Sequence, residues 1–164
     1  MSEYFHPKLL SVESKGPYLL RTTWNTGEIL LVDVEAVLRR IPALALILDP
    51  KIFAGVHLGE GGDSIEWIDS EFGADNVYAW GKEQAGKVSH EMFATWMQRN
   101  RLSLTTAAEA LGISRRMVSY YRTAHKPIPR AIWLACLGWE ATRPRPHELP
   151  RNLPTIQEYA VIHG

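Results

Sequence analysis

Several features are scarce in this sequence of 164 residues, and each scarcity excludes a class of protein. Cysteine occurs once, at Cys136 in the apolar run AIWLACLGW, so no internal disulfide can form and the thiol is expected to be a small buried hydrophobe. No apolar run approaches the length of a membrane span, and MSEYFHPKLL lacks the basic start and apolar centre of a signal peptide. We therefore expect a cytoplasmic protein.

Metal-binding and catalytic motifs are also missing. The six histidines have no metal-type spacing, and the acidic residues between Glu60 and Asp75 lack the Asp-x-Asp-x-Asp-Gly loop of a calcium site, which favours a solvated or partner-facing acidic rim. The glycine-rich turn at 59–62 is not followed by the Lys-Ser or Lys-Thr of a phosphate loop, and no Gly-x-Ser-x-Gly elbow occurs. We expect no metal, no cofactor and no enzymatic activity.

The formal net charge is zero, but the two halves of the chain differ in sign. Residues 1–81 hold six Lys and Arg against twelve Asp and Glu, a net charge of −6. Residues 82–164 hold twelve against six, a net charge of +6. This asymmetry indicates two units with different partners, and the basic half is the one expected to meet a polyanion.

The first half has the pattern of a small α+β unit. Short β-rich segments alternate with turns, and the Asn25–Gly27 turn has hairpin chemistry. We expect strands at 8–14, 17–24, 28–34, 52–58 and 64–68, helix over 34–49 with a break at Pro42, and a short helix capped by Asp75. The predicted fold class is α+β, with an antiparallel sheet in the first half and an all-α second half.

Composition changes between Gly81 and Ser89, where GKEQAGKVS is polar and carries two glycines. The sequence therefore predicts an acidic α+β domain at 1–82, a helical domain at 88–141 and a tail at 142–164. The segment TRPRPHELPRNLP holds four prolines and is expected to be extended. Arg143, Arg145 and Arg151 in the tail could contact phosphates, the acidic domain or nothing.

The segment from Ser103 to Thr123 fits the demands of two short helices joined by a tight turn. Such a unit needs capped helix starts, small residues where the helices touch, a glycine at the turn and apolar residues on the inner face of the second helix. These positions are filled by Ser103, Ala107, Ala108, Leu111, Gly112, Ile113, Ser114, Val118 and Tyr121.

On these residues, 89–140 resembles the helix-turn-helix domain of the lambda-repressor and Cro family, with an apolar helix carrying Trp96 before the motif and a proline-started helix carrying Trp133 after it. The resemblance implies that the helix from Ser114 enters the major groove of DNA and that its first residues touch base edges. The first half resembles, less specifically, a bacterial domain family of unknown function through NTGEILLVDV and LDPKIFAGVHLGEGGDSIEW. That second resemblance implies a fold and no chemistry.

Helical geometry independently predicts which residues face outward. At about 100° per residue, Arg116, Ser119, Tyr120 and Thr123 lie opposite the inward-facing arc around Val118 and Tyr121. The outward face carries no acid, whereas an ordinary solvated helix mixes both signs; a merely solubilising surface is the alternative. The expected DNA-binding residues are Ser114, Arg115, Arg116, Ser119, Tyr120, Arg122, Thr123 and Lys126.

Together these patterns predict a sequence-specific binder of double-stranded DNA, functioning as a transcriptional regulator and a homodimer. The acidic domain would dimerise, sense a ligand or bind a protein partner. The alternative from another class is a protein-interaction module, an antitoxin-like adaptor whose acidic half masks a basic partner.

Overall fold

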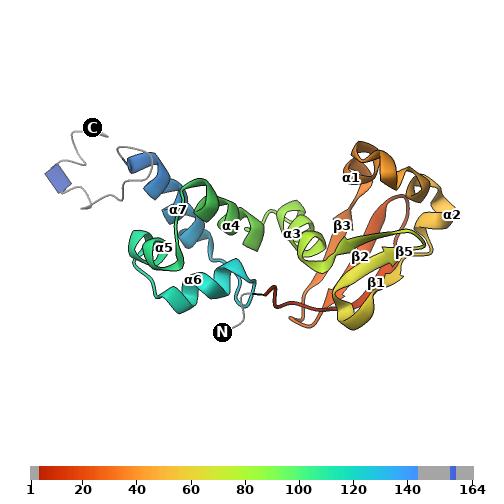
Figure 1. Cartoon of the computed structure of the whole chain (residues 1–164), viewed down its shortest axis with the longest axis horizontal. Helices are drawn as coiled ribbons and strands as arrows, with labels where there is room; N and C mark the ends of the chain where they lie inside the picture. Colours follow the sequence, from red (N-terminus) through yellow and green to blue (C-terminus); the bar gives the residue numbers. More distant parts are fainter. Residues whose placement is uncertain (1–3, 144–155, 158–164) are drawn as a thin grey trace.

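The computed structural model describes residues 4–143 and 156–157 and has an α+β fold. Figure 1 shows two halves placed side by side along the long axis. Strands and the first short helices form one end, four helices form the other, and α3 (Ala74–Gln84) lies between them. The N-terminal segment runs from the helical end to the first strand.

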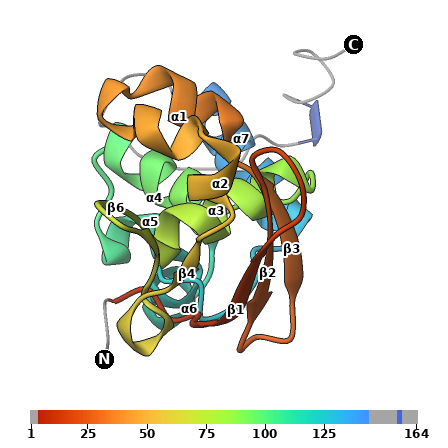
Figure 2. The ribbon, with the colours of Figure 1, turned by 90° about the vertical axis from the view of Figure 1, so that its right-hand side faces the viewer.

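Two three-stranded antiparallel sheets build the N-terminal half (Figure 2). The first has the order β1 (Leu9–Ser14), β2 (Leu19–Trp24), β3 (Ile29–Asp33), and the second β4 (His57–Leu58), β5 (Ser64–Trp67), β6 (Ser70–Gly73). Alternate residues of β2 are buried because successive side chains point to opposite faces of a strand. The antiparallel sheet was predicted, and β6 was not.

The short helices correct two sequence-based expectations. The chain does break at Pro42, between α1 (Glu35–Arg40) and the 3-10 helix η1 (Pro42–Leu48). The strand expected at 52–58 is wrong for its first half: α2 (Pro50–Phe53) begins there, because Pro50 suits a first helical turn and the Asp49 carboxylate accepts the Lys51 N–H at 2.9 Å. A second short 3-10 helix, η2 (Glu60–Gly62), follows β4. Asp75 does not cap α3, since Gly73 holds the cap position.

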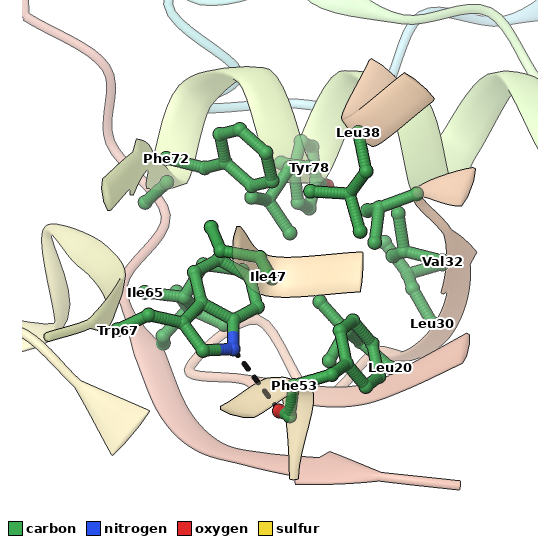
Figure 3. Close-up of a cluster of buried hydrophobic side chains, with 14 of the residues drawn as sticks. Leu20, Leu30, Val32, Leu38, Ile47, Phe53, Ile65, Trp67, Phe72 and Tyr78 are labelled. Atoms are coloured by element: carbon green, nitrogen blue, oxygen red, sulfur yellow. Dashed lines mark hydrogen bonds between the residues drawn. The ribbon is translucent and has the colours of Figure 1, made fainter. Parts of the chain in front are cut away.

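The core of the N-terminal half is aromatic and aliphatic (Figure 3). Phe53, Trp67, Phe72 and Tyr78 converge on it from α2, the second sheet and α3, and the Trp67 indole donates to the Phe53 carbonyl at 3.0 Å. Trp24 and Trp67 are buried, whereas Trp80 is only half-buried. The indole donor is satisfied within the core, so Trp67 can be buried at no cost in lost hydrogen bonds.

The helical half consists of α4 (His90–Arg99), α5 (Leu104–Leu111), α6 (Arg115–Arg122) and α7 (Arg130–Thr142). Cys136 is fully buried, as predicted, and burial raises the pKa of its thiol to about 12. Trp133, on the same helix, is only half-buried, whereas Trp139 fills the core and meets Trp96 edge-to-face at 5.7 Å.

None of the helices described is long and apolar enough to cross a membrane. Thr142, the first residue of the segment expected to be extended, is the last residue of α7, and the rest of that segment from residue 144, with Arg145 and Arg151, lies outside the described residues. Arg143 is described, and its guanidinium lies 5.4 Å from the centroid of the Trp139 ring. The domain boundaries stay a prediction, although the buried apolar residues do form two clusters, one in each half.

Candidate nucleic-acid interface

The α5–α6 unit is determined by local interactions of its own residues, at the helix caps, the turn and the contact between the helices. Ser103 caps α5 in a capping box with Thr106, and Ser114 caps α6 by accepting the Met117 N–H at 3.1 Å. Gly112 ends α5 in the left-handed conformation with φ of 69°, which a glycine adopts without a Cβ clash. Ala107 is fully buried, and so small a side chain lets the two helices approach closely.

Six of the eight expected site residues are exposed or half-exposed, as the sequence predicted. Ser114, Arg115, Arg116 and Lys126 are exposed, while Tyr120 is half-buried. Arg122, also half-buried, closes the helix at its last turn. The Ser114 hydroxyl is occupied by its capping bond, so its role in the geometry is to start α6.

Ser119 and Thr123 correct the prediction, because both side chains are buried, at 1% and 2% exposure. The buried arc of α6 is wider than the contact with α5 alone requires. Tyr121 packs edge-to-face on Phe93 of α4 at 5.7 Å, and the Thr123 carbonyl accepts the His6 N–H at 2.8 Å. Neither hydroxyl can therefore reach a base edge.

Tyr120 orders the exposed arginine one turn before it. The Arg116 Nε donates to the Tyr120 hydroxyl at 2.5 Å, and the guanidinium carbon lies 5.2 Å from the ring centroid. Both contacts hold an otherwise flexible side chain along the surface of α6. Lys126 Nζ lies 5.6 Å from the same ring, so three residues form one cationic and aromatic surface.

The two halves meet at a junction that no sequence pattern predicts. Phe5 packs on Trp24, Tyr78 and His90, with the His90 ring centroid at 4.8 Å, and Ala124 joins the core of the N-terminal half. Burial lowers the pKa of His90 to about 4, and the charge of Asp75 opposes this only in part. The end of α6 is thus fixed against the N-terminal half.

A partly buried ion pair holds α3 to the sheet beside this junction. Lys82 is 5% exposed and its Nζ donates to the Glu28 carboxylate at 2.7 Å, while the Tyr78 hydroxyl donates to the other oxygen. Burial raises the pKa of Glu28, but hydrogen bonds from Lys82, Tyr78 and Thr26 together outweigh it and leave the pKa below its usual value. Burial and the same carboxylate raise the pKa of Tyr78.

The opposite charge gathers in a groove of about 310 Å³ between α4 and α7. Its walls include Trp96 and Trp133 and the carboxylates of Glu83, Glu91 and Glu140, with Arg99 pairing with Glu140 at 3.2 Å. Burial and the charges of Asp75 and Glu83 raise the pKa of Glu91. Because the carboxylates outnumber the single arginine, this groove is less suited to a phosphate than the α6 surface. No cluster of His, Cys, Asp and Glu among the described residues could hold a metal ion.

The structure brings together residues that sequence reasoning missed. His125 stacks on Tyr120 with centroids 5.2 Å apart, and His6 stacks on His125 at 3.9 Å. The position of His125 beside Lys126 is a sequence signal that could have placed His125 in the site. Nothing in the sequence around His6 indicates a position at the end of α6.

Comparison with known proteins gives one informative similarity. A solved structure named "Putative DNA Binding Protein NE0471", from Nitrosomonas europaea ATCC 19718, is 72% identical to this chain and superposes with a TM-score of 0.84. The match covers 94% of this chain and all of that one. No protein-family model and no curated protein matches the chain.

Proposed function

This chain belongs to the same family as the Nitrosomonas europaea protein, and from that premise we propose that it is a sequence-specific DNA-binding protein that regulates transcription. One observation on this chain supports DNA binding independently of the name of that relative. Segment 114–126 holds four Arg and Lys and no acid, and Arg115 and Arg116 stand exposed in the first turn of α6. The proposal assigns the protein no catalytic activity.

The proposed mode of binding is that of a lambda-repressor-like helix-turn-helix domain. Helix α6 lies in the major groove, where a guanidinium in its first turn donates two hydrogen bonds to one guanine. The Tyr120 ring pre-orders Arg116 and so reduces the side-chain entropy lost on binding. Lys126, past the end of the helix, contacts a phosphate.

A single helix of this length reads few base pairs, so we propose a homodimer on a two-fold-related site. Its half-sites would lie about one helical turn, roughly 34 Å, apart. Sedimentation of the protein with and without its selected duplex measures the stoichiometry. One protomer on the full site would refute the dimer and leave DNA binding intact.

The decisive experiment selects bound sites from random DNA and then measures variants on selected and random duplexes across a salt series. Arg115→Ala and Arg116→Ala should each cost about 1–3 kcal/mol on the selected site and less on random DNA. Lys126→Ala should weaken both alike and reduce the salt slope by about one unit. If the double arginine variant stays folded and keeps full specific affinity, α6 is not the recognition helix.

A second candidate function rests on the outer face of the first sheet. Leu10, Ile29 and Leu31 are 60%, 53% and 55% exposed there, an apolar surface suited to a protein partner or a second copy of the chain. An adaptor of this kind would co-purify with another protein and ignore DNA. Leu31→Lys should then abolish the partnership while leaving the fold intact.

A further inference from the structure

Three aromatic rings from two halves of the protein stack at the end of α6. Tyr120 comes from the helix, His125 from the loop after it, and His6 from the N-terminal segment that crosses from the other half. The His6 N–H bond to the Thr123 carbonyl fixes this segment. Arg116 and Lys126 both lie against the Tyr120 ring, so the stack continues the cationic surface beyond the helix.

Hydrogen bonding assigns the tautomer of His125. The Thr123 hydroxyl donates its single proton to the Ser119 carbonyl at 2.7 Å, so it can only accept from His125 Nδ1, at 2.8 Å. Nδ1 therefore carries a proton, and Nε2 is the acceptor of the neutral ring. Within the described part of the chain Nε2 makes no hydrogen bond. On protonation it becomes a donor.

The two charged side chains on the Tyr120 ring, against which His125 stacks, are both cations. Arg116 lies on this ring from α6 and Lys126 from the loop, while Lys8, two residues after His6, is already paired with Asp63. No ion pair or hydrogen bond within residues 4–143 brings a carboxylate to either ring. Burial first, and then the charge of His6, lower the pKa of His125. Two positively charged rings whose centroids lie 3.9 Å apart would repel each other, and a bound anion would offset that repulsion.

We propose that His6, His125 and Lys126 form a site for a backbone phosphate of DNA, and that the two imidazoles take up protons when the phosphate binds. The inference rests on the proposed function and extends it, since it places a residue of the N-terminal half in the DNA interface. Thr123 is then a positioning residue that orients His125. The docked N-terminal segment becomes part of the binding surface.

The test measures the affinity of the full chain for selected and random duplexes between pH 8 and pH 6 at constant ionic strength. The wild-type affinity should rise on the order of tenfold as the pH falls, on both duplexes, because a phosphate contact carries no sequence information. His6→Phe and His125→Phe keep a stacked ring without a titrating group, so each should reduce the rise and the double variant should abolish it. His57→Phe, at an exposed histidine on β4, is the control and should keep the rise.

The outcomes separate the inference from the function on which it rests. If the wild type binds neither duplex at any pH, the proposed function fails. If it binds but the folded double variant retains the rise, or the wild type shows none, the phosphate site is wrong. Should the variants unfold, NMR of the wild type decides: adding duplex at pH 7 must move the ring signals of His6 and His125 towards the protonated position, and unmoved signals overturn the proposal.

Discussion

At the scale of single residues, Tyr120 controls how the first turn of α6 meets a ligand. Its hydroxyl accepts the Arg116 Nε–H and its ring lies under the guanidinium, so Tyr120→Phe removes the first contact and keeps the second. We expect a loss of about 1 kcal/mol in binding to the selected duplex and less on random DNA. Equal losses on both would show that Tyr120 acts on a phosphate contact rather than on base reading. Fluorescence anisotropy at fixed salt measures both.

At the scale of elements, two glycines hold left-handed turns for different reasons. Gly112 has open space where a Cβ would lie, so Gly112→Ala should cost only the backbone strain, about 1 kcal/mol. At Gly62, with φ of 73°, a Cβ would lie 2.3 Å from the Leu9 carbonyl oxygen, so Gly62→Ala should cost well over ~2 kcal/mol. Urea unfolding measures both.

Gly138, inside α7 with open space around it, is the matched control for this pair. Gly138→Ala should stabilise the protein by up to about 1 kcal/mol, because alanine is the better helix former. A destabilisation there equal to that of Gly62→Ala would mean that the costs do not come from local geometry.

At the scale of the whole molecule, the junction makes stability depend on pH through His90. Its folded-state pKa of about 4 lies below the usual value near 6.5, so the unfolded chain binds a proton that the folded chain excludes. The stability linked to His90 is complete above about pH 6.5 and is lost as the pH falls towards 4, by about 2 kcal/mol between pH 7 and pH 5. The His90→Phe variant should lack this part of the fall in the free energy of unfolding, as measured with urea. In the His57→Phe variant, the free energy of unfolding should fall with pH as it does in the wild type.

The junction also bears on whether the halves fold independently. Cleavage between Gly81 and Ser89 should leave a C-terminal fragment that folds, because α4 to α7 share their own buried cluster. The fragment should be less stable than the intact chain and bind DNA more weakly, since it loses Phe5 and His6 and exposes His90 and Ala124. Circular dichroism and anisotropy measure the two effects. An unfolded fragment would refute the predicted boundary.

The sequence by itself determined the α5–α6 unit and the α+β class, because both depend on local chemistry. Capping hydroxyls at Ser103 and Ser114, a left-handed glycine at 112 and small residues at the helix contact act within a few residues of one another. The alternation of apolar residues likewise identified the first three strands. The sequence pattern predicted a strand over the end of α2 because Ile52 and Phe53 suit a strand and a buried helical turn equally well.

Only the tertiary structure decided which residues of α6 face solvent. A helical wheel assumes one packing partner, whereas α6 touches α5, α4 and the N-terminal segment, and these contacts bury Ser119 and Thr123. The stack of His6 on His125 joins residues from opposite ends of the chain. Such a contact leaves no periodic signal in sequence, because it depends on where folding places two segments and not on the residues beside either one.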